Sequence, residues 1–373
     1  MLRYAVQTMS WSSLRSHCLP IFLRITLLFI ACWGMSWAVA SELPDDFDQM
    51  PDDLQTVLLD FISPQQADIW GADSKVSGTH SLVRYLDDYH TQVEVDFMDG
   101  VVRVETRGAE EPRQQLRQAV VSILLTPADP RMIDLYTAAD FGLTGTPFLL
   151  GQVVDHDGKE IGGLWRAERF ADYLLKNNLQ RTRHGLRITM PMVSQHQVVA
   201  ARSFGRSVVR SANKYRVDTA LIYAVIETES SFNPLAVSPS NAYGLMQVMP
   251  RTAGRDVMDK IYKSDRTPSK RYLLDPEQNI DFGTAYLSIL RDNYLRGINN
   301  PLAQEYCMIA SYNGGAGQLL KSFHRDRSEA LRRINRMSAK DVYRHITRRH
   351  PKAETRNYLK KVIERKQKYA GIG

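Results

Sequence analysis

Cysteine is scarce in this chain of 373 residues, and its scarcity excludes one common way of stabilising a fold. Two of the three cysteines, Cys18 and Cys32, lie in the first 40 residues, which we interpret below as a leader. Once a leader has been removed, only Cys307 remains, so no disulfide can form within the mature chain. Cys307 lies in the apolar run Tyr306-Cys-Met-Ile-Ala310, which is typical of a small core residue.

Motifs for metals and nucleotides are also missing. No set of cysteines and histidines has the spacing of a zinc site, and no glycine-rich loop of the phosphate-binding kind occurs. We therefore expect neither a metal nor a nucleotide cofactor.

The apolar run from Ile25 to Trp37 is too short for a comfortable transmembrane helix. Basic residues precede it and the small residues Ala38-Val-Ala40 follow it, so residues 1–40 are predicted to be a signal peptide cleaved after Ala40. Alternatively, Phe29-Ile-Ala-Cys32 is a lipid-attachment box that anchors the chain through Cys32. We favour it less because Phe heads the box and apolar residues would follow the lipidated cysteine. Both alternatives predict export to the periplasm, and the second adds attachment to the outer membrane.

Charge is divided unequally along the rest of the chain. Ser41–Met190 contains 14 Lys and Arg against 25 Asp and Glu, whereas the chain from Pro191 onward contains 31 against 16. Such a division is typical of separate domains with different neighbours. We predict an N-terminal accessory domain over residues 41–190 and a second domain over residues 191–373.

The acidic part has mixed periodicity. Asp52–Ile62 is predicted to be helical, and His90–Phe97 alternates before an Asp99-Gly100 turn and a returning strand, which indicates a β-hairpin. A second hairpin is predicted around Asp157-Gly158. Helices are expected at Pro112–Leu125 and Ala167–Leu179, which gives a small α+β domain. The polar residues His90, Asp99 and Glu105 are interpreted as surface residues.

The basic part is predicted to be entirely helical, so the fold class of the whole chain is α+β. The expected helices are Val198–Tyr215, Thr219–Ser231, Arg251–Ile261, Ile280–Asn293, Glu305–Asn313 and Tyr358–Ala370. The basic segment from Lys352 to Lys368 is interpreted as a solvated helix face.

One of these helices carries the residue of greatest chemical interest. Asp218 is placed to cap its first turn, and Pro234 follows its end. At 100° per residue, Glu229 shares a stripe with Ile222, Val225 and Ile226, whereas Glu227 falls on nearly the opposite side and is expected to be solvated. A desolvated carboxyl has a raised pKa and can act as a general acid. The helix alone also allows a structural carboxylate.

The motifs around Glu229 decide between these alternatives, because through them the sequence resembles the lysozyme-like lytic transglycosylases of the Slt type. The resemblance rests on four ordered motif groups: Glu229-Ser230 with Phe232-Asn233-Pro234 and Ala236-Val-Ser238; Gly244-Leu-Met-Gln247 with Met249-Pro-Arg-Thr-Ala253; Ser311-Tyr-Asn-Gly-Gly-Ala-Gly317; and Glu354-Thr-Arg-Asn-Tyr358. It also places Asn279 and Gly283 in the pattern of the Ile280–Asn293 helix. Two departures, Asn241 where a glycine is frequent and Ser311 where an alanine is usual, remove no group that the chemistry needs.

The resemblance implies the roles of the remaining site residues. Glu229 would be the catalytic acid and Tyr358 would orient it. Tyr312 and Asn313 would hold the acetamide of the intermediate, Ser238 would bond to the acetamido or lactyl region, and Met246 and Gln247 would line a sugar subsite. Ser238 and Gln247 are equally compatible with stitching of the loop, and Tyr312 with a packed core aromatic.

The implied reaction is cleavage of peptidoglycan without water, between N-acetylmuramic acid and N-acetylglucosamine, to leave 1,6-anhydromuramic ends. No acidic residue lies between Glu229 and Asp256, which agrees with a site that has one carboxyl group. The alternatives are a hydrolytic muramidase, which needs a second acid, and a non-catalytic wall-binding module, against which Glu229 and Tyr358 argue.

Substrate and partners follow from the same considerations. A basic domain suggests nucleic acid, but an exported protein rarely meets it, whereas glycan strands of peptidoglycan carry carboxylates for a basic face to attract. We expect no nucleic-acid partner. Tyr136 to Arg187 resembles the N-terminal domain of a membrane-bound branch of the same family, and a binding or orienting role is expected for it.

Overall fold

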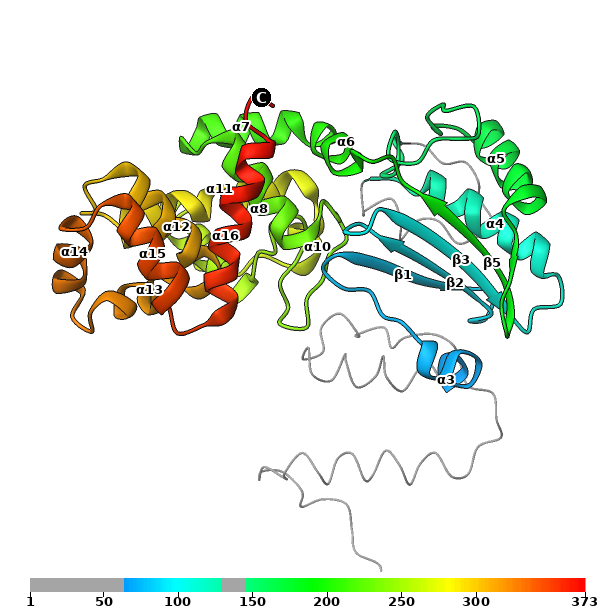
Figure 1. Cartoon of the computed structure of the whole chain (residues 1–373), viewed down its shortest axis with the longest axis horizontal. Coiled ribbons are helices and arrows are strands. Elements are labelled where there is room, and N and C mark those ends of the chain that lie inside the picture. The colour runs from blue at the N-terminus through cyan, green and yellow to red at the C-terminus, as the bar shows by residue number, and fades with distance from the viewer. Residues whose placement is uncertain (1–63, 129–144, 373) are drawn as a thin grey trace, which may run out of the picture. The chain divides into compact units, whose positions relative to one another are not determined.

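The computed structural model describes residues 64–128 and 145–372, which belong to one compact unit, Pro64–Gly373 (Figure 1). The predicted leader, the expected helix Asp52–Ile62 and part of the segment Tyr136–Arg187 lie outside the described residues. Within the unit there are two hydrophobic cores, one under a β-sheet and one among helices. This arrangement confirms the predicted α+β class.

The first core is covered by a five-stranded antiparallel sheet in the order β1-β2-β3-β5-β4. The strands are β1 (Ser81–Leu86), β2 (Thr91–Asp96), β3 (Val101–Arg107), β4 (Gln180–Arg181) and β5 (Gly185–Pro191). The predicted hairpin is confirmed as β2 and β3, with Gly100 at φ +67°, a conformation that favours glycine. Two helices, α4 (Pro112–Leu125) and α5 (Leu164–Asn177), pack together, and α4 contacts β2, β3 and β5 (Figure 1). A short helix α3 (Pro64–Trp70) and a turn η2 (Gly71–Asp73) precede the sheet.

Three expectations for this region need correction or refinement. The prediction of a second hairpin is wrong, because the segment around Asp157-Gly158 forms only isolated β-bridges, such as the one between Val154 and Glu160. The helices expected at Pro112–Leu125 and Ala167–Leu179 are confirmed, the latter three residues earlier at its start. Glu105 is 5% exposed rather than a surface residue, because Arg107 and Arg187 form salt bridges with its carboxylate.

The second core lies among helices. They are α6 (His196–Ser203), α7 (Gly205–Tyr215), α8 (Thr219–Ser230), η4 (Pro250–Gly254), α9 (Arg255–Lys260), α10 (Lys270–Leu274), α11 (Pro276–Ile289), η5 (Leu290–Tyr294), α12 (Pro301–Gly314), α13 (Ala316–Phe323), α14 (Arg327–Asn335), α15 (Ala339–Arg349) and α16 (Ala353–Lys368). Figure 1 shows α16 running beside α8, and the two helices are in contact. Cys307 is fully buried in this core, as predicted.

The structure divides three of the expected helices. Val198–Tyr215 is broken at Phe204 into α6 and α7, Arg251–Ile261 begins with the π-helical turn η4, and Ile280–Asn293 runs from α11 into the π-helical turn η5. Helix α8 is buried on all sides from Ala220 to Glu227, so it is a central helix rather than one with a single apolar stripe.

Candidate active site

Helix α8 delivers Glu229 to the edge of the helical core. The Asp218 carboxylate accepts a hydrogen bond from the backbone N–H of Ala220 at 3.0 Å, which confirms the predicted N-cap. The helix ends at Ser230, because Ser231 and Phe232 both adopt left-handed backbone conformations, with φ of 51° and 65°. The end of the helix is thus set before Pro234, and Glu229 occupies its last turn.

Glu229 has an environment that favours its protonated form. Burial raises the pKa of its carboxyl from an ordinary value of 4.5 to about 7, against the lowering effect of a hydrogen bond from Tyr358. The Tyr358 hydroxyl donates to Glu229 Oε1 at 2.7 Å, and the negative charge of Glu354 raises the pKa further. Part of the surface of Glu229 stays exposed, so a substrate can reach it. A carboxyl with these properties can donate a proton near neutral pH.

Glu227 is not solvated, contrary to the expectation from the helical wheel. It is 4% exposed and forms salt bridges of 3.2 Å with both Arg365 and Lys368, and the Tyr369 hydroxyl donates to it. The wheel assumed one exposed face, whereas α16 covers the face on which Glu227 lies. The same contacts show that the basic segment Lys352–Lys368 is only partly a solvated face.

The loop between α8 and η4 is stitched by its own polar side chains. Ser238 Oγ accepts from the backbone N–H groups of Ser240 and Ala242 at 3.2 and 3.0 Å. Gln247 donates through Nε2 to the carbonyls of Ala236 and Gly244 at 3.2 and 2.9 Å. Both residues therefore shape the loop in this structure.

Asn279 on α11 fixes the same loop from the other side. Its Oδ1 accepts from Met246 N, and its Nδ2 donates to the carbonyls of Tyr243 and Leu273, each at 2.7 Å. A Cβ on Gly244, which has φ +71°, would lie 2.5 Å from Asn279 Nδ2, so the loop approaches this amide as closely as glycine permits.

Met246 is fully buried, so its side chain packs behind the loop and does not face the surface. A Cβ added to Gly283 would lie 2.5 Å from Met246 Sδ, and this close contact holds Met246 against α11. The Tyr312 hydroxyl donates to the Met246 carbonyl at 2.8 Å, and the Tyr312 ring lies 5.6 Å from the ring of Tyr286. Burial and the nearby charge of Glu229 raise the pKa of Tyr312, so its hydroxyl remains a donor.

Asn313 connects α12 to the start of α16. Its Nδ2 donates to Glu354 Oε1 at 2.8 Å, and its Oδ1 accepts from Thr355 Oγ1 at 2.7 Å. In the sequence, Glu354 stands out only as part of a motif, and its electrostatic effect on Glu229 was not predicted. Its position four residues before Tyr358, and hence on the same face of a helix, was the available signal.

The sheet region contacts the segment that follows Glu229. His80 Nδ1 lies 2.9 Å from Ser231 Oγ, and Asn233 donates to the carbonyls of Gly78, Thr79 and Ser81 at 3.3–3.4 Å. Leu235 packs against the core of the sheet region. These contacts fix the backbone just after the helix that carries Glu229, and nothing in the sequence pattern indicated them.

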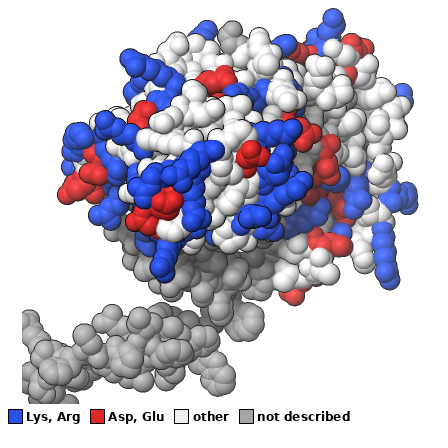
Figure 2. Space-filling model, turned by 60° about the vertical axis from the view of Figure 1, so that its left-hand side comes forward, with Lys and Arg blue, Asp and Glu red and all other residues white. Residues whose placement is uncertain are grey.

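Within residues 64–128 and 145–372, no helix is long and apolar enough to cross a membrane. The same ranges contain no group of three His, Cys, Asp or Glu side chains arranged to hold a metal ion. Figure 2 shows Lys and Arg side chains outnumbering acidic ones on the face brought forward, on either side of an uncharged band.

Comparisons with known proteins cover both parts of the chain. Residues 47–203 match the model of the N-terminal domain of membrane-bound lytic murein transglycosylase C, and residues 207–335 match the transglycosylase SLT domain. Proteins named membrane-bound lytic murein transglycosylase C from Yersinia enterocolitica and Shigella sonnei are 45% and 46% identical over 307 residues, 81% of this chain and 86% and 85% of theirs. Among solved structures, the 70-kDa soluble lytic transglycosylase of Escherichia coli is 26% identical over 48% of this chain and 28% of its own, with a TM-score of 0.36.

Proposed function

The chain belongs to the family of membrane-bound lytic murein transglycosylase C, and from this premise we propose that Glu229 is the single catalytic acid and base of its reaction. The protein is a peptidoglycan lytic transglycosylase. The observation that supports the role of Glu229 is its one direct partner among the described residues, the neutral Tyr358 hydroxyl, together with a pKa raised to about 7.

The reaction follows from one carboxyl group acting twice. Glu229 gives its proton to the glycosidic oxygen, the bond from that oxygen to C1 of N-acetylmuramic acid breaks, and the N-acetylglucosamine hydroxyl leaves. The resulting Glu229 carboxylate takes the proton of the C6 hydroxyl as the C6 oxygen bonds to C1. Glu229 ends protonated, no water is consumed, and the product is a 1,6-anhydro end.

The neighbouring residues serve these steps in different ways. Tyr358 holds the Glu229 carboxyl in place through its hydrogen bond. Tyr312 and Asn313 flank the site and are proposed to receive the acetamide of the intermediate. Ser238 and Gln247 shape the loop that meets the sugar, and the buried Met246 supports that loop from behind.

A hydrolytic reaction is the second candidate, because the structure brings one further carboxylate near. The charge of Glu354 reaches Glu229, but Glu354 Oε1 already accepts a hydrogen bond from Asn313. A hydrolase would need Glu354 to activate a water molecule across the scissile bond.

Mass spectrometry of muropeptides released from purified sacculi separates the two candidates. Products about 18 Da lighter than those of a muramidase, by the mass of one water, are expected from internal attack by C6. Reducing, hydrated ends would contradict the proposal and would direct attention to Glu354. Sacculi treated with Glu229→Gln serve as the control for background cleavage.

Location and domain roles complete the proposal. The relatives are named membrane-bound, which supports membrane association for this chain. We place the protein in the periplasm, and attachment of a lipid to Cys32 would account for membrane association, which cleavage after Ala40 alone does not. Cys32→Ser should then shift the protein from the membrane pellet to the soluble fraction, and an unchanged distribution would reject the lipid. Residues 41–190 would act as an accessory domain beside the transglycosylase domain at 191–373.

A further inference from the structure

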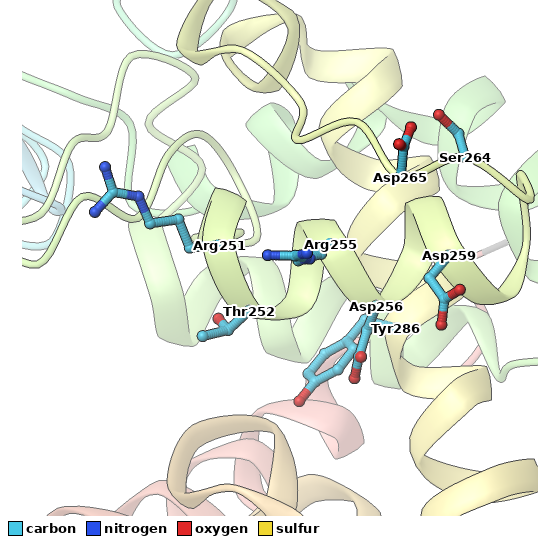
Figure 3. A pocket seen from close by; sticks show the side chains of 8 residues that line it. All are labelled: Arg251, Thr252, Arg255, Asp256, Asp259, Ser264, Asp265 and Tyr286. Carbon is cyan, nitrogen blue, oxygen red and sulfur yellow. The ribbon is translucent and has the colours of Figure 1, made fainter.

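A cavity adjoins the active site and takes no part in the chemistry described above (Figure 3). Its volume is about 510 Å³, and it is lined by Arg251, Thr252, Arg255, Asp256, Asp259, Ser264, Asp265 and Tyr286. The centroid of the Tyr286 ring lies 5.6 Å from that of the Tyr312 ring, and the Tyr312 hydroxyl donates a hydrogen bond to the Met246 carbonyl. The cavity therefore begins one aromatic ring beyond the residues that surround Glu229.

The cavity is built on an unusual stretch of helix. Its first turn, η4, is π-helical. Such turns are rare in proteins overall, and those that occur are often found at functional sites. In Figure 3 the side chains of Arg251, Arg255 and Asp259 come from successive turns of η4 and α9, whereas Ser264 and Asp265 come from the loop after α9. Residues four apart lie on one side of a helix, so both charge signs meet along one face.

Several of these charges have no partner among the described residues. Neither Arg251 nor Arg255 forms an ion pair there, and the carboxylate of Asp265 accepts no hydrogen bond. Asp256, by contrast, is occupied by Lys260 and by the Tyr294 hydroxyl, each at 2.8 Å. Asp259 is 72% exposed and only 3.5 Å from Lys260 at its nearest. The cavity thus offers a ligand two guanidinium groups that form no ion pair with the described residues, together with the carboxylates of Asp259 and Asp265.

We propose that this cavity binds the peptide arm of the glycan substrate, with Arg251 and Arg255 on its free carboxylates and Asp259 and Asp265 on a free amino group. Guanidinium groups pair with carboxylates in a two-bond geometry, and carboxylates pair with ammonium groups. The peptides of peptidoglycan carry both kinds of group where a diamino acid is present. N-acetylglucosamine carries no charge and would use neither kind of side chain, and Tyr286 is the one aromatic residue among those that line the cavity.

This inference rests on the proposed function, since the ligand is part of the same substrate. The test compares two substrates: glycan strands that keep their peptides, and the same strands after an amidase has removed the peptides and the lactyl carboxylates that it leaves have been converted to methyl esters, so that the bare strands carry no charge. The double variant Arg251→Ala/Arg255→Ala is measured on both. Arg202→Ala/Arg206→Ala is the matched control, because it removes two exposed arginines at the same spacing, outside the cavity and without ion pairs among the described residues.

The wild-type protein should cleave peptide-bearing strands with a kcat/KM about tenfold above that for bare strands, in keeping with two charge-assisted pairs. Arg251→Ala/Arg255→Ala should remove this preference and leave cleavage of bare strands unchanged, whereas the control should keep it. Acetylation of the free amino groups of the peptide should lower the preference of the wild type in the same direction.

Equal loss on both substrates, or no loss on either, would overturn the peptide assignment. Cleavage of bare strands with anhydro products would still uphold the proposed function in that case. Absence of cleavage of either substrate by the wild type would instead refute the function itself, so the two failures are distinguishable.

Discussion

The two faces of α8 carry glutamates two residues apart that the structure uses in opposite ways. Glu227 pairs with Arg365 and Lys368 and accepts a hydrogen bond from the Tyr369 hydroxyl. Glu229 accepts from the neutral Tyr358 hydroxyl, its one side-chain partner among the described residues, and lies near the negative charge of Glu354. Both carboxyl groups are enclosed by the same neighbouring helix, α16. Burial is the largest cause of the raised pKa of Glu229, and no cation among the described residues pairs with its carboxyl group. Glu227 is also buried but is paired with two cations, so burial together with the charge of the neighbours distinguishes the two carboxyl groups.

The largest effect on activity is expected when the proton donor on one of these two faces is removed. Glu229→Gln keeps the shape of the side chain and should lower kcat by about a thousandfold or more, since general acid catalysis alone contributes about 10²–10⁴. Turnover of sacculi gives the rate, and circular dichroism confirms the fold. A variant that retains most of its turnover would show that another group is the acid.

The same variant should also change how the free energy of unfolding depends on pH. The folded protein binds the Glu229 proton more tightly than the unfolded chain, which adds stability that is complete below about pH 4.5 and is lost as the pH rises through about 7. Glu229→Gln lacks this loss, so its stability relative to the wild type should rise over that pH range.

Glu227→Gln tests the other face and should affect stability in place of chemistry. It leaves Arg365 and Lys368 without a counter-charge in a mostly buried place, so the free energy of unfolding should fall by about 3 kcal/mol. Chemical denaturation measures this change. The matched control is Glu364→Gln on α16, an exposed glutamate without an ion pair among the described residues, which should change stability by about 0.5 kcal/mol or less. Loss of turnover in a fully folded Glu227→Gln protein would assign this face to the chemistry as well.

The smallest expected effect comes from the hydrogen bond that distinguishes Glu229. Tyr358→Phe removes only the hydroxyl, which lowers the pKa of Glu229, so the alkaline limb of the kcat/KM profile should move to higher pH. A fall in kcat of about tenfold is expected from the poorer orientation of the acid. Tyr343→Phe on α15 is the control, because its hydroxyl makes no hydrogen bond among the described residues. An unchanged pH profile in Tyr358→Phe would reduce Tyr358 to a packing role.

Local signals account for the parts of the fold that were predicted. The β2–β3 hairpin could be derived from alternation and an Asp-Gly turn, and the start of α8 from its capping aspartate, because each depends on residues close in sequence. Strand β5 was missed since its partner β3 lies about eighty residues earlier, and α4 and α5 intervene. The second hairpin had the same kind of turn signal but formed no ladder.

The candidate site shows the same division. Ordered motifs pointed to Glu229 and Tyr358, and the structure brings them into contact. The environment of Glu227 could not be derived, because a helical wheel does not reveal which helix covers which face. The cavity beside Tyr286 was missed because exposed arginines and aspartates occur over the whole protein surface, and the sequence does not show which of them line the same cavity.

Helix α16 has a consequence for the order in which the enzyme is made. Tyr358 follows Glu229 by 129 positions, and the counter-charges of Glu227 come later still. A ribosome produces α16 last among the described helices, so a growing chain carries Glu229 without its aligning hydroxyl and Glu227 without its cations. A nascent or truncated chain that ends before α16 therefore lacks the hydroxyl that aligns Glu229 and the cations that pair with Glu227, and the complete site forms only after α16 has been synthesised.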